Sequence, residues 1–287
     1  MSIEFKEVSH SYEKRKKNNI NVDAIKNINL TIDDKDEFVF IVGGTGAGKS
    51  TMLQHINGLL LPTDGVVQIG DLVLSSNKRK NPKLKEVRKK IGFVFQFPEY
   101  QLFEETVFKD IIYGPLNFGF SLEEASKQAK KIAEKLKISD ILDKSPFNLS
   151  GGQMRKVAIA GILAYNPDVL LLDEPTRGLD PLGANEIMEF FDELNKGQHK
   201  TIIMISHDMN LVYRYAKRVI VLGKGEILFD GKKEDLFSGL YQKYSLDKPN
   251  ILKSIDFLNE KLNLNISYYN YTLEDLLTSL RDGDLSE

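Results

Sequence analysis

The segment from Gly43 to Thr51, GGTGAGKST, places glycines, a lysine and hydroxyl residues in the order G-x-x-x-x-G-K-[ST]. It follows the apolar run FVFIV and precedes TMLQHINGLL, which reads as a helix, and a phosphate-binding loop requires this context. Glycines let backbone N–H groups approach phosphate oxygens, Lys49 can reach the β- and γ-phosphates, and the Ser50 hydroxyl can coordinate Mg²⁺. The residues predicted to bind a nucleoside triphosphate are Gly43, Gly44, Thr45, Gly46, Ala47, Gly48, Lys49, Ser50 and Thr51.

A second set of polar residues follows two apolar runs. VLLLDEP ends with Asp173 and Glu174 at the carboxyl end of a predicted buried strand, where α/β sheets bind ligands. Asp173 suits the coordination shell of Mg²⁺, and Glu174 can accept a proton from an attacking water, as phosphoryl transfer to water requires. His207 follows TIIMIS and would lie at the same edge, where it could hold the γ-phosphate and the water. A lone histidine after a strand is often structural, but the neighbouring motifs favour a functional interpretation.

The stretch NLSGGQMRK places Ser150, Gly151, Gly152 and Gln153 before a helical run. A Ser-Gly-Gly start leaves backbone N–H groups free at the positive end of a helix, which is how proteins commonly hold a phosphate. An ordinary serine N-cap with a glycine turn would explain Ser150 and leave the Gly-Gly-Gln unexplained. The chain therefore carries two phosphate-type motifs, far apart in the sequence.

The elements that must position these motifs alternate between short strands and helices, which is typical of an α/β domain with a buried parallel sheet. FVFIV (38–42), VLLLD (169–173) and TIIMIS (201–206) are apolar on both faces, as fully covered strands are. Three other segments alternate or turn at glycine, which suggests hairpins in an antiparallel side sheet. They are IEFKEVSHSY (3–12), VVQIGDLVL (66–74) after the Asp64-Gly65 turn, and RVIVLGKGEILFDG (218–231).

Two further regions read as helical. Residues from about 98 to 165 form an inserted helical lobe, and the tail after about 235 contains two small amphipathic helices. The first tail helix is marked by Ile251, Ile255, Leu258 and Leu262, and the second by Leu273, Leu276, Leu277 and Leu280 behind Thr272 as a possible N-cap.

Composition limits the classes of function. The 287 residues are 41% hydrophobic and 28% charged, an ordinary globular composition, and the net charge of -2 gives no global reason to expect nucleic acid. The absence of cysteine excludes disulfides and thiolate metal sites, and the opening MSIEFKEVSH lacks the apolar core of a signal peptide. The longest apolar runs are far below the roughly 18 residues that cross a bilayer. We therefore expect a cytoplasmic protein whose membrane role, if any, needs another chain.

Together, the motifs resemble the ATP-binding subunit of ABC transporters in their order and spacing. The matching stretches are Gly43 to Thr51, LSGGQ (149–153), LLLDEP (170–175), GLD (178–180) and His207. The resemblance implies a P-loop NTPase (ABC ATPase) core with an antiparallel β subdomain and an inserted helical subdomain, within residues 1–235. The C-terminal helical tail, residues 236–287, is similar to the small dimer-stabilising appendage that one group of these ATPases carries.

The same resemblance assigns further residues. The one matching Gln96 opens a mobile loop that senses the γ-phosphate and Mg²⁺, Asp180 lies in a loop crossing the dimer interface, and Tyr12 stacks on adenine. LSGGQ faces the phosphate loop of a second subunit, so each ATP lies between two chains. The resemblance thus implies that Glu174, His207, Gln96 and Lys49 are the catalytic residues. It implies that Ser50, Gln96 and Asp173 hold Mg²⁺. The residues that would contact the partner's ATP are Ser150, Gly151, Gly152 and Gln153.

Four stretches are similar in sequence to the ATPases of energy-coupling factor (ECF) importers, which take up vitamins and metal ions. The similarity is closest to the second of their two paired ATPases. The stretches are PEYQLFEETV, QHINGLLLPTDG, YGPLNFG and LSGGQMRKVAIAGILA. This implies an ATP-hydrolysing subunit at the cytoplasmic face of the cell membrane, paired with a second, similar ABC ATPase. Its other partners would be an integral membrane coupling protein and a substrate-binding membrane subunit, with no nucleic acid. The alternatives are the ATPase of another ABC importer or exporter, and a soluble non-transport ABC ATPase.

Four features depart from these patterns or stay open. The run after Gln96 is unusually aromatic, partly as core and partly as a surface suited to a partner helix. Arg177 occupies a position where small residues are common in ABC ATPases, and KRKKNN (14–19) lengthens the first hairpin. NKRKNPKLKEVRKK (77–90) is strongly basic, which suits a solvated loop or attraction to anionic lipid headgroups or acidic partner loops.

Overall fold

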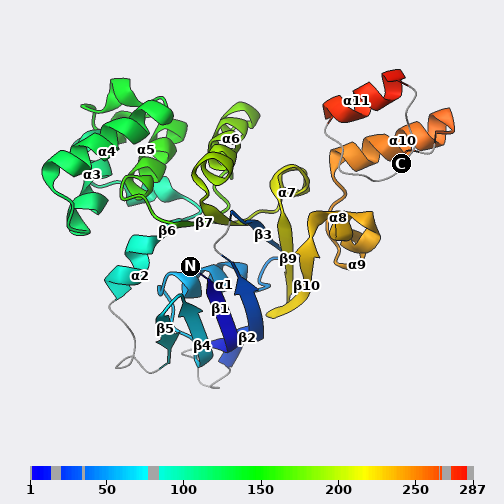
Figure 1. Ribbon diagram of the computed structural model, residues 1–287, viewed down its shortest axis with the longest axis horizontal. Coiled ribbons are helices and arrows are strands. Elements are labelled where there is room, and N and C mark those ends of the chain that lie inside the picture. The colour runs from blue at the N-terminus through cyan, green and yellow to red at the C-terminus, as the bar shows by residue number, and fades with distance from the viewer. Residues whose placement is uncertain are drawn as a thin grey trace.

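The computed structural model describes residues 2–13, 21–33, 36–76, 84–264, 266 and 273–282. Within them, a mostly parallel sheet lies between a smaller antiparallel sheet and a group of helices (Figure 1). The predicted N-cap Thr272 and the basic residues 14–19 and 77–83 fall outside the described residues. In the described part of the chain, none of the helices combines the length and the apolar character needed to cross a bilayer.

The larger sheet has the order β10-β9-β3-β8-β7-β6. Its strands are β3 (Phe38–Val42), β6 (Ile91–Val94), β7 (Val169–Asp173), β8 (Thr201–Ile205), β9 (Arg218–Gly223) and β10 (Glu226–Lys232). All pairs are parallel except β9 with β10. β3, β6, β7 and β8 are buried along their whole length, as strands covered on both faces are.

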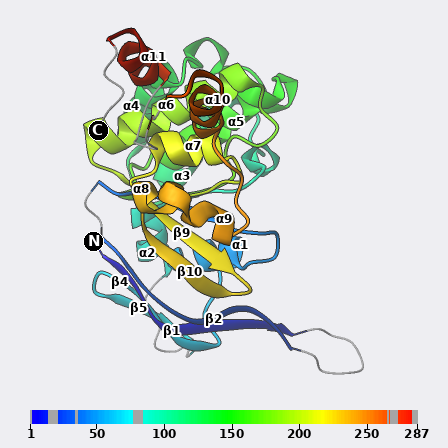
Figure 2. The same cartoon turned by 90° about the vertical axis from the view of Figure 1, so that its right-hand side faces the viewer.

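The smaller sheet is antiparallel, with the order β2-β1-β4-β5. Its strands are β1 (Ile3–Glu13), β2 (Asn21–Ile32), β4 (Asp64–Ile69) and β5 (Leu72–Ser75). Figure 2 shows this sheet extended along the base of the molecule, beside α1. Tyr12 lies on β1 near its end, so this sheet brings the tyrosine towards the phosphate loop.

The helices divide between the two faces of the larger sheet, as alternate residues of β3 show. Val39 and Ile41 share a core with α1 and the antiparallel sheet, whereas Phe38 and Phe40 share another core with the helices of the opposite face. The longer helices are α1 (Lys49–Ile56), α2 (Leu84–Lys90), α3 (Val107–Asn117), α4 (Leu122–Lys135), α5 (Gly151–Leu163), α6 (Pro181–Gln198) and α7 (Met209–Tyr215). Short turns complete this part, namely η1 (Pro98–Gln101), η2 (Ser139–Ile141) and η3 (Pro146–Asn148).

The tail contains the two predicted helices, α10 (Asn250–Leu262) and α11 (Leu273–Asp282), after the short turns α8 (Lys233–Asp235), η4 (Leu236–Leu240) and α9 (Tyr241–Lys243). Leu252 and Ile255 of α10 are buried and belong to the same apolar cluster as the helices of the main body, whereas Leu276 of α11 is buried beside α10. In addition, the Asn250 backbone N–H donates to the Asn210 side chain at 2.7 Å, which ties the start of α10 to α7. The tail therefore packs on its own chain through one face and leaves other apolar side chains exposed.

Two sequence expectations differ from the structure. The hairpin at 218–231 was expected in the side sheet, but β9 pairs with β3 and so extends the larger sheet. The glycine turn and the alternating β10 resemble a half-exposed hairpin, yet β9 itself is covered on both faces. The helix expected at 51–60 begins earlier, at Lys49, and ends at Ile56, because Gly58 adopts a positive φ of 67°. The strand β6 was not anticipated, and β2 was expected only as the second strand of the first hairpin.

Candidate active site

Four neighbouring strands of the larger sheet, β3, β8, β7 and β6, end at one edge. Because their pairing is parallel, the residues that follow these strands meet there. At this edge, Gly43 and Glu174 directly follow β3 and β7, and Gln96 and His207 are the second residues after β6 and β8. The fold thus brings together groups that are far apart in the sequence.

The phosphate loop between β3 and α1 depends on two glycines. Gly43 has φ 138°, and a Cβ there would lie 2.0 Å from the Leu222 carbonyl oxygen. Gly48 has φ 101°, and a Cβ there would lie 2.3 Å from the Ala24 carbonyl oxygen. A side chain at either position would therefore force the loop away from β9 or β2. The loop directs the first turn of α1, with its free N–H groups, towards the sheet edge.

Lys49 is folded into this loop. Its Nζ donates to the carbonyl oxygens of Gly43 at 2.8 Å and Gly44 at 3.0 Å, and the residue is 7% exposed. Burial lowers the pKa of Lys49, and the charges of Glu174 and Asp173 oppose that shift. The Lys49 ammonium group therefore lies at the centre of the loop, where two backbone carbonyl oxygens hold it.

Ser50 and Asp173, the two predicted Mg²⁺ ligands nearest the loop, are already in contact. The Ser50 hydroxyl donates to the Asp173 carboxylate. Burial raises the pKa of Asp173, and the bond from Ser50 opposes this rise. A hydroxyl and a carboxylate at the end of a buried strand provide two oxygen ligands of the type that Mg²⁺ prefers.

Glu174 lies at the centre of the site, with φ 49°, a conformation that is uncommon outside glycine. His207 Nε2 lies 2.9 Å from Glu174 Oε1, and Gln96 Nε2 donates to Glu174 Oε2 at 3.2 Å. The structure therefore brings two predicted catalytic residues, His207 and Gln96, from two other loops into contact with the carboxylate of the third, Glu174. This arrangement fits a carboxylate that orients and deprotonates a water, with a histidine and an amide beside it.

Sequence reasoning missed one group at this carboxylate. Arg177 Nη1 lies 3.1 Å from Glu174 Oε2, so the arginine noted only as a departure from the family pattern contacts the predicted base. The available signal was the spacing, because opposite charges three residues apart in one turn can meet. In this structure Glu174 therefore has donors at both oxygens.

Tyr12 lies beside α1, as its predicted adenine contact requires. Its hydroxyl lies 3.3 Å from Thr51 Oγ1, and its ring packs edge-on against His10 at 4.6 Å between centroids. Behind it, His10 packs against His55 at 4.8 Å. Burial lowers the pKa of His55 to about 4, so this ring is neutral near pH 7. The histidines support Tyr12 from the protein side, and the tyrosine remains 44% exposed.

The LSGGQ segment opens α5, on the opposite face of the sheet from α1. Ser150 is the N-cap, and its side chain forms a reciprocal capping box with Gln153. Helix capping therefore explains both Ser150 and Gln153, whereas the sequence alone had suggested a capping role only for Ser150. It leaves the glycines unexplained, since among the described residues no atom lies within 4 Å of where a Cβ of Gly151 would be. Asp180 is exposed and caps α6 through Gly183 N–H at 2.7 Å.

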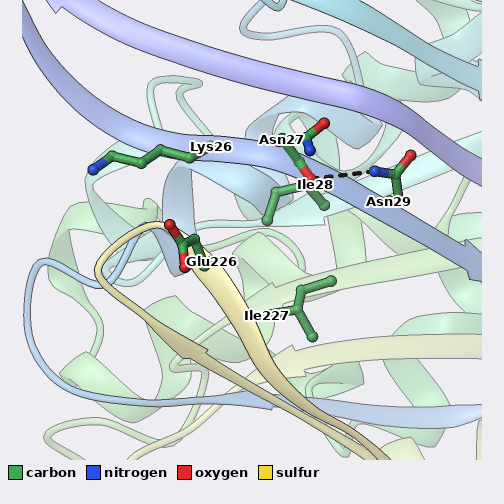
Figure 3. A pocket seen from close by; sticks show the side chains of 6 residues that line it. All are labelled: Lys26, Asn27, Ile28, Asn29, Glu226 and Ile227. Carbon is green, nitrogen blue, oxygen red and sulfur yellow. Dashed lines mark hydrogen bonds between the residues drawn. The ribbon is translucent and has the colours of Figure 1, made fainter.

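An open hollow lies apart from these residues, between β2 and β10 (Figure 3). Its lining residues are Lys26, Asn27, Ile28, Asn29, Glu226 and Ile227. The Asn29 amide donates to the Asn27 carbonyl oxygen at 3.3 Å across its rim. The hollow contains none of the predicted site residues and is distinct from the candidate site.

Comparisons with known proteins agree with this geometry. The family model described as ABC transporter matches residues 25–177. The energy-coupling factor transporter ATP-binding protein EcfA2 of Bacillus cereus is 47% identical over 279 residues, which cover 96% of this chain and 94% of the relative. Its counterpart in Bacillus subtilis (strain 168) is 46% identical over 261 residues, covering 90% and 94%.

Solved structures give the same result. CbiO1 from Clostridium perfringens, described as part of the ABC transporter complex cbiONQ, superposes with a TM-score of 0.73 at 32% identity, covering 91% of this chain and 95% of that one. The ATP-binding cassette MJ0796, in a dimeric post-hydrolysis state bound to ADP and Pi, gives 0.70 at 36% identity, covering 80% and 98%. Fold, site and relatives define the class: this is an ABC-type ATPase.

Within that class, the chain belongs to the ATP-binding proteins of energy-coupling factor transporters, with the EcfA2 proteins among its relatives. The fold class, the ABC resemblance and the ECF resemblance expected from the sequence are thereby confirmed. The roles of individual site residues and the domain boundaries remain predictions.

Proposed function

We propose that this chain binds MgATP at the edge formed by β3, β8, β7 and β6, and that hydrolysis there powers uptake of a vitamin or other micronutrient. The observation that carries the proposal is the contact of His207 and Gln96 with Glu174, beside a formed phosphate loop. In this scheme Glu174 is the general base, and His207 and Gln96 hold the water and the γ-phosphate. Ser50, Gln96 and Asp173 would hold Mg²⁺, which neutralises charge on the β- and γ-phosphates.

The proposed site is shared between two ATPases. This chain's own fold gives no reason for glycine at position 151, because a Cβ there would meet no described atom within 4 Å. Such glycines are useful where a ligand or a group of another molecule must approach the backbone closely. A triphosphate held on the phosphate loop of another subunit fits this requirement, with Asp180 near the same contact. The MJ0796 cassette, solved as a dimer, offers a precedent among relatives.

A membrane partner would bind at the aromatic surface after Gln96. Tyr100 on η1 is 85% exposed and Phe103 is 56% exposed, and Phe103 packs edge-on against Tyr113 on α3. This exposed cluster directly follows the residue that contacts Glu174, so a helix seated there would lie close to the catalytic loop. We place the chain peripherally at the cytoplasmic face of the cell membrane, with a coupling protein and a substrate-binding subunit as partners and no nucleic acid.

Part of the basic stretch serves the chain's own fold. Arg88 Nη2 donates to the Gly58 carbonyl oxygen at 3.1 Å, and the Lys89 ammonium lies 5.3 Å from the centre of the Phe120 ring. For these two residues internal contacts explain the positive charge, and no membrane role is needed.

The aromatic surface gives a direct test. Replacing Tyr100 with Glu should reduce co-purification of membrane partners or transport several-fold, because a charge would be buried in an apolar contact, while ATP affinity stays within about twofold. A pull-down from detergent extract, with nucleotide titration alongside, measures both. The matched control is Leu122→Glu, since Leu122 is also well exposed, at 61%, but lies at the start of α4. Equal loss of ATP binding in Tyr100→Glu would show that Tyr100 supports the fold.

The subunit composition gives a second test. We expect a complex with one copy of this chain and one of a second, similar ATPase on the membrane partners, measured as native mass. The tail should contribute to the pair through exposed Phe257, Leu273 and Leu277, which border a groove between α10 and α11. Leu277→Glu should therefore loosen the nucleotide-free pair. Truncation is a poorer experiment, because Leu252 and Ile255 pack in the chain's own core. Two copies of this chain without a second ATPase would refute the heterodimer.

A further inference from the structure

Arg155 is a buried charged residue without an assigned role. It lies in the second turn of α5, is 3% exposed, and follows Gln153 by two positions. Burying a guanidinium costs free energy unless its donors are paired, so its partners show what the position requires. Those partners come from two other segments of the candidate site.

The first partner is Glu99 on η1. Arg155 Nη2 donates to Glu99 Oε1 at 2.8 Å, and Arg155 Nε donates to Glu99 Oε2 at 3.2 Å, so the pair is bidentate. The Glu99 side chain is itself only 14% exposed. A planar fork that engages both carboxylate oxygens fixes orientation as well as distance. Arg155 thus holds the aromatic segment that begins after Gln96 at a fixed position relative to α5.

The second partner is the loop that follows Glu174. Arg155 Nη1 donates to the Arg177 carbonyl oxygen at 2.5 Å and to the Pro175 carbonyl oxygen at 3.3 Å. Pro175 is the next residue after Glu174, and Arg177 contacts the Glu174 carboxylate through its own side chain. One guanidinium therefore joins the segment proposed to receive the membrane partner, the helix that starts with LSGGQ, and the backbone beside the general base.

We propose that Arg155 is a positioning residue that transmits movement of η1 and α5 to the loop carrying Glu174. The inference rests on the proposed function, because it takes Glu174 as the base and η1 as the docking segment. Arg155 touches none of the reacting groups. It acts by setting where Glu174 lies, and a small displacement of a catalytic group can lower a rate by up to about a hundredfold.

The neighbouring residue provides a matched control. Lys156, also on α5, forms an ion pair with Glu186 on α6 at 2.8 Å. That pair joins two helices and contacts neither η1 nor the loop after Glu174 through any described hydrogen bond. Loss of a charged contact from α5 can thus be compared with loss of the specific connection that Arg155 makes.

The test uses the full-length chain, purified with the subunits that accompany it and with any second ATPase inactivated at its own catalytic base, so that kcat and KM for ATP report this chain's site. Arg155→Met should lower kcat by roughly tenfold to a hundredfold with KM within about threefold, because the phosphate loop is untouched. Arg155→Lys should recover part of kcat, since an ammonium can still pair with Glu99 but cannot make the full fork. Lys156→Met should keep kcat within about twofold. Equal effects of Arg155→Met and Lys156→Met, or a loss carried by KM, would overturn the proposal.

Two further measurements keep the test decisive if Arg155→Met does not fold. Glu99→Gln leaves Arg155 in place and weakens only its connection to η1, so kcat should fall by a smaller factor; an unchanged kcat would overturn the inference. The chain contains no tryptophan, so Tyr100→Trp adds a single reporter on η1. MgATP should change its fluorescence, and adding Arg155→Lys should reduce that change while ATP still binds. A full change in the double variant would also overturn it.

Failure of the proposed function would look different. A wild-type complex that binds no MgATP, or binds it without hydrolysis, would refute the ATPase assignment whatever the variants do. A wild-type complex that hydrolyses MgATP, together with Arg155 and Glu99 variants of unchanged kcat, would refute only the positioning role.

Discussion

Replacing Glu174 with Gln should lower the rate of ATP hydrolysis at this chain's own phosphate loop by roughly a hundredfold to ten-thousandfold, with little change in MgATP affinity there. Glutamine has nearly the same shape but cannot take the proton of the attacking water. Lys49, Ser50 and Asp173 stay in place, because their contacts run to the phosphate loop and to each other. Single-turnover hydrolysis and equilibrium nucleotide binding, measured on the same preparation, separate the two quantities. ATP should then accumulate in closed dimers, visible as a larger native mass.

Lys49→Ala is the contrasting variant. The Lys49 ammonium lies inside the phosphate loop, so its removal should weaken MgATP binding itself and leave no ATP-trapped dimer. A Glu174→Gln complex that turns over at nearly the wild-type rate would remove Glu174 from the role of base. His207, at 2.9 Å from Glu174 Oε1, would then become the leading candidate.

The sequence predicted the position of the site because each motif is local and follows a strand. Gly43 follows FVFIV, Glu174 follows VLLLD and His207 follows TIIMIS, and the carboxyl ends of neighbouring parallel strands share one edge. Motif and strand therefore fixed both the identity of these residues and their convergence. The contacts of Glu174 with Gln96 and His207 follow from that convergence.

Long-range pairing was outside the reach of sequence reasoning. Glu99 and Arg155 are 56 positions apart, and neither belongs to a motif whose chemistry names its partner. The placement of β9 failed for a related reason, since its pairing with β3 depends on the whole sheet and not on the local alternation of 218–231. Local patterns specify elements and their ends, whereas tertiary packing decides which faces and which charges meet.

The proposed shared site would explain how hydrolysis drives movement. A ligand shifts a conformational equilibrium only by its differential affinity for the two states. MgATP held between a phosphate loop and the LSGGQ segment of another subunit contacts both only when the pair is closed, so it favours closure. Cleavage of the γ-phosphate removes that preference. With η1 tied to α5 through Glu99 and Arg155, closure would also move the aromatic surface that we propose receives the membrane partner.

Gly151→Asp should abolish most hydrolysis at the partner's phosphate loop while leaving the fold of this chain intact. Gly151 is the first residue of α5, where an acidic side chain interacts favourably with the helix dipole, so the free energy of unfolding should stay unchanged or rise by up to about 1 kcal/mol. The space around it is open among the described residues, so the new carboxylate meets no atom of its own chain. In the closed pair, however, it would face the partner's triphosphate, and like charges brought together cost several kcal/mol. We expect hydrolysis at the partner's phosphate loop to slow on the order of a hundredfold, with ATP affinity of the chain's own phosphate loop within about threefold.

Thermal unfolding, nucleotide titration and steady-state hydrolysis test this expectation on one preparation. Gly197→Asp is the matched control, because Gly197 on α6 also has open space around it and the variant adds the same charge elsewhere. It should hydrolyse ATP at nearly the wild-type rate. A Gly151→Asp chain that loses thermal stability would mean that the glycine serves its own fold. Normal hydrolysis by a stable Gly151→Asp complex would mean that LSGGQ does not approach a partner's nucleotide, and the shared site would be wrong.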